Sequence, residues 1–136
     1  MIDWKLVAAF RSQASEQLTK ALGEDRVSTD RAAQEALGRS IILELLEAAA
    51  AEAVTSGQRS WTLAEQDALA QAVFDALFRM GRLQPLIEDD RVENIIITGF
   101  DRVWLELADG SRIQGPPVAD SDQELIDFLA FLASRS

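Results

Sequence analysis

Four acidic residues in the segment EDDRVE are the first candidates for chemistry in this chain. Glu88, Asp89, Asp90 and Glu93 carry carboxylates, and hard divalent cations prefer oxygen ligands of this kind. Their order lacks the glycine-punctuated spacing of an EF-hand loop, and a solvated acidic turn is the reading we favour, because surface acids are the norm. We therefore predict no metal site.

Arginine is the second residue type with chemical potential. Arg82, Arg91, Arg102 and Arg112 surround a stretch rich in β-branched residues, and the guanidinium fork suits phosphate recognition. Arg102 and Arg112 are candidates for contacting a nucleotide held by another domain. The alternative is that these arginines pair with the abundant acids nearby.

Much familiar catalysis is excluded by composition. The chain has no Cys and no His, which removes thiolate chemistry and the commonest general base. No GxxxxGK[ST] motif occurs, and the only lysines are Lys5 and Lys20, so a phosphate-binding P-loop is absent. We expect no catalytic residue, no cofactor and no enzyme activity in this chain by itself.

The net charge is −10 over 136 residues, with 48% hydrophobic and 26% charged residues. This balance is typical of a folded domain, and the excess of acids argues against nucleic-acid binding. The charge is uneven, because residues 61–136 hold 6 basic and 14 acidic side chains, a net charge of −8. Neither a membrane span nor a signal peptide is visible, so we expect a cytoplasmic location.

Three amphipathic helices are predicted to hold the first part of the chain, over residues 3–22, 28–57 and 62–81. Gly23, Gly57 and Gly81 follow the apolar stripes at positions typical of helix ends. Gly38 is a weak point inside the second helix. The stripes that we expect to be buried are Val7, Phe10, Ala14 and Leu18; then Ala33, Leu37, Ile41, Leu45, Ala49 and Val54; then Leu69, Val73 and Leu77, widened by Phe74 and Phe78.

Capping residues support two of these helix starts and a later one. Thr62 and Glu65 have the spacing of a capping box, as do Ser121 and Glu124. The possible caps of the second helix are Ser28, Thr29 and Asp30.

After Gly81 the pattern changes to short strands. Pro85 marks a turn and a short helical piece, VENIIIT reads as a strand, and RVWLEL alternates between apolar and polar residues. Asp109 and Gly110 suit the type I′ turn of a tight hairpin, which leads into a third strand at 112–114. In the first strand, Ile95 and Ile97 are expected to share one face, with Val92 and Ile96 on the other.

A closing helix is expected after Pro117, with one face formed by Leu125, Phe128, Leu129 and Leu132. The predicted fold is therefore α+β: a three-helix bundle over residues 1–80, then a small, mainly antiparallel sheet of about three strands covered by a C-terminal helix over residues 81–136. A sheet of this size is marginal unless its faces and edges are covered, so we expect this second region to be cut short before a further domain.

The alternation of RVWLEL also marks a surface. Val103, Leu105 and Leu107 point one way, and Arg102, Trp104 and Glu106 point the other. Tryptophan is enriched in binding hot spots. We expect this second face to meet solvent or a partner, and we take these three residues, with the acids Glu88, Asp89 and Asp90, as the interaction candidates.

The segment GRLQPLIEDDRVENIIITGFDRVWLELADGSRI resembles the region just ahead of the motor domain in bacterial type II and type IV secretion ATPases, most closely the CpaF-like branch of Tad/Flp pilus assembly. The positions that correspond to the family's pattern are Gly81, Pro85, Leu86, Asp89, Asp90, Val92, Ile95, Thr98, Gly99 and Val103. Gln84 and Thr98 depart from the family, which often has a small residue and Asn at these places. The resemblance covers about a quarter of the chain.

This resemblance implies the N-terminal regulatory and docking domain of a hexameric ATPase. ATP and magnesium would be bound by a motor domain beyond Ser136, against which this domain packs in its own or a neighbouring subunit. The parent protein would act in protein transport at the inner face of the cell membrane, coupled to inner-membrane platform proteins. The alternative is a stand-alone acidic adaptor that binds a basic protein through Glu88, Asp89, Asp90, Glu93 and the Trp104 face.

Overall fold

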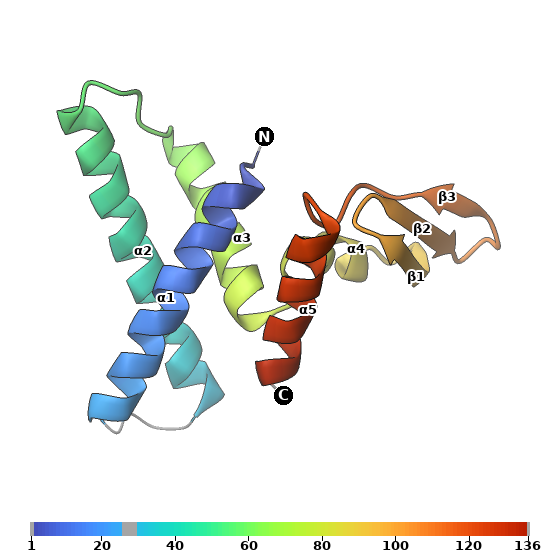
Figure 1. Cartoon of the computed structure of the whole chain (residues 1–136), viewed down its shortest axis with the longest axis horizontal. Helices are drawn as coiled ribbons and strands as arrows, with labels where there is room; N and C mark the ends of the chain where they lie inside the picture. Colours follow the sequence, from blue (N-terminus) through green and yellow to red (C-terminus); the bar gives the residue numbers. More distant parts are fainter. Residues whose placement is uncertain (1, 26–29, 136) are drawn as a thin grey trace. The chain divides into compact units, whose positions relative to one another are not determined.

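A computed structural model describes residues 2–25 and 30–135 and shows an α+β fold, as the sequence predicts (Figure 1). In chain order the elements are α1 (Trp4–Asp25), α2 (Arg31–Thr55), α3 (Leu63–Phe78), η1 (Gly81–Leu83), α4 (Gln84–Glu88), β1 (Val92–Gly99), β2 (Arg102–Leu107), β3 (Arg112–Gln114) and α5 (Asp122–Arg135). The chain divides into two compact units, Met1–Gly81 and Arg82–Ser136, and each is described here by itself.

The first unit is a bundle in which α1, α2 and α3 each contact the other two. The stripe predicted for α1 is confirmed, since all four of its residues are buried, and so are Leu69, Val73 and Leu77 of α3. Phe74 is buried beside them, while Phe78 is half-buried. Apolar residues at helical spacing therefore do form the core of this unit.

The stripe predicted for α2 is confirmed only in part and is wrong at its end. Ile41 is buried, whereas Ala33, Leu37, Leu45 and Ala49 are half-buried. Val54 is 65% exposed, and the buried positions are Gly38, Ile41, Ile42 and Leu46 in the middle of the helix. Steps of four residues drift around a helix of 3.6 residues per turn, and the last step of this stripe, from Ala49 to Val54, is five residues. Over 25 residues, the stripe cannot stay on the side that faces α1 and α3.

Two glycines of this unit differ from expectation. Helix α1 runs through Gly23 to Asp25, because a glycine inside a helix costs only about 1 kcal/mol and does not by itself end it. Gly38 is a contact point rather than a weak point, since a Cβ at this position would overlap the ring of Phe78. The absence of a side chain lets α2 and α3 approach closely.

An ion-pair network joins α2 to the end of α3. The Glu35 carboxylate accepts hydrogen bonds from both terminal nitrogens of Arg79, at 2.9 and 3.0 Å, and one from Arg31 Nε at 3.0 Å. The Arg39 guanidinium lies 4.1 Å from the centre of the Phe74 ring. The hydrogen bond from Arg79 is the main cause that holds the pKa of Glu35 below its usual value.

The predicted capping box of α3 is confirmed. Thr62 Oγ1 accepts from the Glu65 N–H at 3.1 Å, and the Glu65 carboxylate accepts from the Thr62 N–H at 2.8 Å. At the start of α5, Ser121 Oγ accepts from the Glu124 N–H at 3.1 Å, but the Glu124 carboxylate accepts from the N–H of Asp120. In this second box, the carboxylate therefore bonds to the N–H of the residue before Ser121 and not to that of Ser121 itself.

The start of α2 differs as well. Asp30 is the N-cap residue, yet its side chain makes no capping hydrogen bond. Ser28 and Thr29, the other possible caps, lie outside the described residues.

The second unit contains a three-stranded antiparallel sheet in the order β1-β2-β3. The connection from β2 to β3 is a three-residue turn rather than the predicted two-residue type I′ turn. The Gly110 N–H donates to the Leu107 carbonyl at 3.0 Å, and the Leu107 N–H donates to the Ser111 carbonyl at 2.9 Å. Gly110 has a φ of +89°, which glycine adopts without steric cost. The Asp109 carboxylate accepts from the Ser111 N–H at 2.8 Å, and this stabilises the longer turn.

A β-bulge corrects the faces expected for β1. Val92 pairs with Leu107, but the next pair along is Asn94 with Glu106, so Glu93 is an extra residue. An extra residue in one strand shifts every later side chain to the opposite face. Val92 consequently lies on the same side as Ile95 and Ile97, and Ile96 alone of these four points to the other side.

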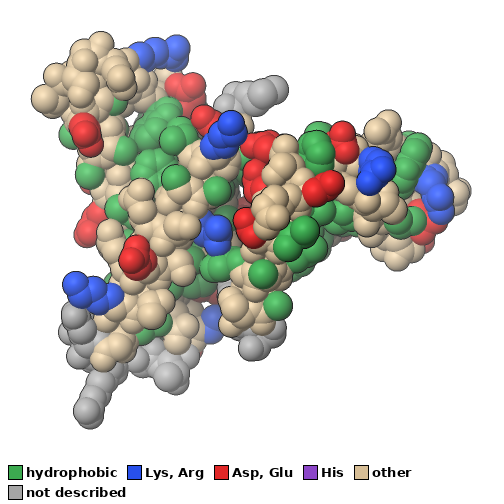
Figure 2. Space-filling view, in the orientation of Figure 1, with side chains coloured by type: hydrophobic (Ala, Val, Ile, Leu, Met, Phe, Trp, Pro, Cys, Tyr) green, Lys and Arg blue, Asp and Glu red, His purple; other side chains and the backbone are tan. Residues whose placement is uncertain are grey.

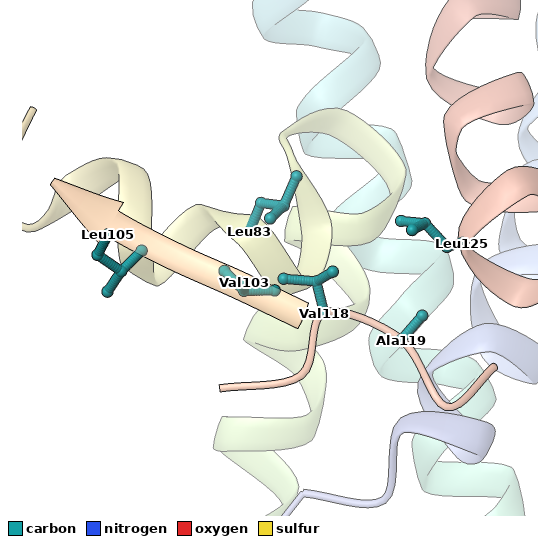
Figure 3. Close-up of a cluster of buried hydrophobic side chains, with 6 residues drawn as sticks. All are labelled: Leu83, Val103, Leu105, Val118, Ala119 and Leu125. Carbon is teal, nitrogen blue, oxygen red and sulfur yellow. The ribbon is translucent and has the colours of Figure 1, made fainter. Parts of the chain in front are cut away.

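The core of the second unit lies on the side of the sheet that carries Val103 and Leu105, which are 0% and 5% exposed. Figure 3 shows these residues of β2 grouped with Leu83 of η1, Leu125 of α5, and Val118 and Ala119 of the connecting loop. Phe128 of α5 also packs on this cluster, but Leu129 is 48% exposed, so its predicted place on the buried face is wrong. The helix meets the core mainly with its first two turns.

Candidate interaction surface

The sheet of the second unit has an outer face that its own core does not cover. Because cross-strand partners share a face, the register places Ile96, Trp104 and Gln114 in one row and Asn94, Glu106 and Arg112 in the next. Trp104 is 41% exposed. Figure 2 shows hydrophobic atoms between basic and acidic side chains over the sheet region.

Trp104 and Glu106 thus occupy the same face of β2, opposite Val103 and Leu105. The Glu106 carboxylate accepts from Arg112 at 2.8 Å, in an ion pair between the neighbouring strands β2 and β3. An indole beside a partly exposed ion pair offers both apolar area and polar groups, which is the composition of many binding hot spots.

Arg102 lies at the end of this face, where the sheet begins its turn. Its guanidinium donates to the Thr98 carbonyl at 3.1 Å and packs over Gly99, where a Cβ would come within 2.8 Å of Arg102 Nε. The two nucleotide candidates therefore both have intramolecular contacts, Arg112 with a carboxylate and Arg102 with the backbone. Their contact with a nucleotide stays a prediction.

The acids Glu88, Asp89 and Asp90 lie where α4 leads into β1. Glu88 accepts from the Gln84 amide at 2.8 Å, and Asp89 accepts from the Arg91 side chain at 2.9 Å and from its N–H at 3.0 Å. The side-chain hydrogen bond from Arg91 is the main cause that lowers the pKa of Asp89. Within residues 2–25 and 30–135, no three acidic side chains are gathered as metal ligands.

The positions that carry the family resemblance have structural roles in the second unit or, for Gly81, at the end of the first. Pro85 stands in the first turn of α4, where its missing N–H has no cost. Val103 is fully buried, and Leu86, Val92 and Ile95 pack against the same cluster. Gly81 begins η1 with a φ of +56°, and Gly99 makes room for Arg102.

Comparison with known proteins gives no assignment. No family model matches the chain, and no curated protein matches it significantly. Among the described helices, none has the length and apolar character needed to cross a membrane.

Sequence reasoning missed three features of the second unit. The sequence predicts that Ile96, the cross-strand neighbour of Trp104, shares a face with Val92, and only the bulge at Glu93 places them on opposite faces. Ile113 is 45% exposed in β3 although it pairs with buried Leu105. Asp122 accepts from the Phe100 N–H at 3.0 Å and so holds the turn between β1 and β2. For Asp122 the sequence contains no signal, because the two groups are 22 residues apart.

Proposed function

We propose that this chain is the N-terminal regulatory and docking domain of a secretion or pilus-assembly ATPase of the CpaF-like branch. The observation that carries the proposal is the segment from Gly81 to Ile113, whose order of residues resembles that family. Nearly all of this segment falls within one compact unit, and Trp104 is exposed on the outer face of its sheet. Of the apolar motif positions, Val103 lies in the core, and Leu86, Val92 and Ile95 are partly buried against it.

In this proposal the outer face docks on a motor domain, in the same or a neighbouring subunit of a homo-hexamer. The motor domain binds ATP and magnesium, and the docking couples nucleotide state to the inner-membrane platform. Trp104 supplies the apolar anchor, and the ion pair between Glu106 and Arg112 provides polar groups around it. The absence of a P-loop motif from these 136 residues agrees with a division of labour between this domain and a separate motor.

The first test is to read the gene beyond the codon for Ser136. A GxxxxGK[ST] motif within the following few hundred residues is the expected result, and its absence would refute the proposal. The second test measures the ATPase rate of the full-length protein carrying Trp104→Ala. We expect a clear loss of ATPase rate or of the hexameric state. Leu63→Ala should leave both unchanged, because it removes an apolar side chain of the first unit that is 77% exposed, against 41% for Trp104.

A second candidate function is an acidic adaptor that acts without a motor domain. It is favoured by the charge of residues 82–136, which carry 5 basic and 11 acidic side chains, a net charge of −6. An adaptor of this kind would bind a basic protein in a salt-sensitive manner. A stop codon directly after Ser136, together with no effect of the chain on any ATPase, would favour it over the first proposal.

A further inference from the structure

The two edges of the sheet in the second unit are unequally protected. On one edge, β3 has only three residues, carries Arg112, and is followed by Gly115, Pro116 and Pro117. Short length, a charged side chain and prolines are features that prevent a further strand from pairing. The other edge is β1, which has eight residues and the uninterrupted run Ile95–Ile97 at its centre.

The backbone groups that β1 presents outward follow from the hydrogen bonds of β2. The Leu107 N–H donates to the Ser111 carbonyl, and the Val103 carbonyl accepts from the Gly115 N–H. The backbone N–H and C=O groups of the odd-numbered residues of β2 therefore point toward β3. In an antiparallel sheet, successive residues direct their N–H and C=O groups to opposite sides. The backbone N–H and C=O groups of Trp104 and Glu106 therefore point toward β1 and bond to those of their partners, Ile96 and Asn94.

It follows that the N–H and C=O groups of Ile95 and Ile97 point away from the sheet. No described residue outside the sheet bonds to them. Helix α4 contacts β1, but the bond that ties the two, from the Val92 N–H to the Asp89 carbonyl at 3.0 Å, is at the beginning of the strand. The centre of the edge therefore presents two backbone N–H donors and two backbone C=O acceptors, those of Ile95 and Ile97.

Charge at the two ends of this edge is acidic. Asp90 and Glu93 precede the run and Asp101 follows it, and all three are exposed and make no ion pair in the described part of the chain. The nearby cations are already engaged: Arg91 bonds to Asp89, and Arg102 bonds to the Thr98 carbonyl. A strand that pairs here would meet a neutral, apolar centre between negative ends.

We propose that the β1 edge binds an extended segment of another protein, apolar in its middle and carrying Lys or Arg at both ends. The segment adds a fourth strand by hydrogen bonding to Ile95 and Ile97. Its residue next to Ile96 lies on the outer face close to Trp104, and its residues next to Ile95 and Ile97 extend the buried side. The inference does not depend on whether a motor domain follows this chain.

The test uses the whole 136-residue chain and the peptide KKTVTVTVKK. In the free protein, the amide protons of Asn94 and Ile96 should exchange slowly with solvent, and those of Ile95 and Ile97 should exchange fast. Peptide should slow the exchange of Ile95 and Ile97, and in a Trp4→Phe, Trp61→Phe background it should shift the emission of Trp104. Protection elsewhere, or none at Ile95 and Ile97, would overturn the proposal.

Two control peptides separate strand pairing from general attraction. The acidic peptide EETVTVTVEE should bind at least about tenfold more weakly than the basic one, because it meets Asp90, Glu93 and Asp101 with like charge. The peptide KKTVTPTVKK keeps the charge but replaces a central valine, whose N–H would point toward β1, and it should bind more weakly as well. Equal binding of all three peptides would count against the edge as the site.

Variants of the protein complete the test. Ile97→Pro removes an outward N–H that β2 does not use, and it should weaken peptide binding by about tenfold relative to Ile97→Val, which shortens the side chain but keeps the N–H. The double variant Asp90→Asn, Asp101→Asn should retain the fold, since both side chains are exposed. It should bind the basic peptide more weakly, and salt should have less effect on its affinity. Unchanged binding in both variants, or dimers of the free chain that pair through β1, would refute the proposal.

Discussion

Glu35 and Arg79 form the contact whose removal should most clearly change the stability of the first unit. The Glu35 side chain is 19% exposed and that of Arg79 is 38% exposed, and two hydrogen bonds join them. Exposed ion pairs contribute about 0.2–1 kcal/mol, and hydrogen bonds to charged groups about 1.5–3 kcal/mol. A partly buried, bidentate pair lies between these limits, so we expect a coupling free energy of about 1–2 kcal/mol.

The assay is a double-mutant cycle with Glu35→Gln and Arg79→Met, because methionine retains much of the apolar stem of arginine. Urea unfolding is followed by tryptophan emission in a Trp104→Phe background, so that only Trp4 and Trp61, both in the first unit, report. Arg31→Ala is the control. Its side chain is 76% exposed, and its i,i+4 bond to Glu35 should contribute about 0.3–0.5 kcal/mol.

The pH dependence of this unit has a definite sign. The pKa of Glu35 is lowered in the folded state, chiefly by the hydrogen bond from Arg79. The stabilisation is therefore fully present above the pKa of the unfolded chain and is lost as the pH falls through the lower, folded value. Glu35→Gln should remove part of the decline in stability below about pH 5. A coupling free energy below about 0.3 kcal/mol, or an acid limb identical in Glu35→Gln, would refute this reasoning.

Three further predictions concern contacts within each of the two units. Gly38→Ala should destabilise the first unit by about 1 kcal/mol even though alanine favours helix, because its Cβ meets the Phe78 ring; in a Phe78→Leu background the same change should become stabilising, as urea unfolding would show. Thr62→Ala should cost about 1 kcal/mol by removing one half of the α3 capping box, and an equal loss from Thr62→Ser would contradict this cause. Leu105→Ala should destabilise the second unit by about 2–5 kcal/mol, since its side chain is buried beneath the sheet. Trp104 emission in a Trp4→Phe, Trp61→Phe background is the probe, and Leu129→Ala, at an exposed side chain, is a near-neutral control.

Much of the fold was predictable because its determinants are local. The stripe from Val7 to Leu18 has the period of a helix, the alternation of RVWLEL has the period of a strand, and Thr62 with Glu65 marks a helix start. Each of these patterns depends on residues within one helix or one strand. Backbone geometry alone relates them to structure.

The errors arose where a distant partner decides the outcome. Gly38 is explained by the ring of Phe78, forty positions along the chain, and the exposure of Leu129 depends on which part of α5 reaches the core. The role of Asp122 depends on a backbone N–H in the turn before β2. None of these partners can be predicted from the residues that are neighbours in the sequence.

The candidate surface shows the same division. The sequence by itself determined that Trp104 and Glu106 oppose Val103 and Leu105, and that acids precede the isoleucine run, because alternation and composition are properties of the chain. Only the tertiary structure decided that Glu93 is bulged, that Val92 joins the buried side, and that Ile95 and Ile97 present their backbone groups outward. The physical reason is that side-chain direction and hydrogen-bond direction in a strand are set by its register with the neighbouring strand.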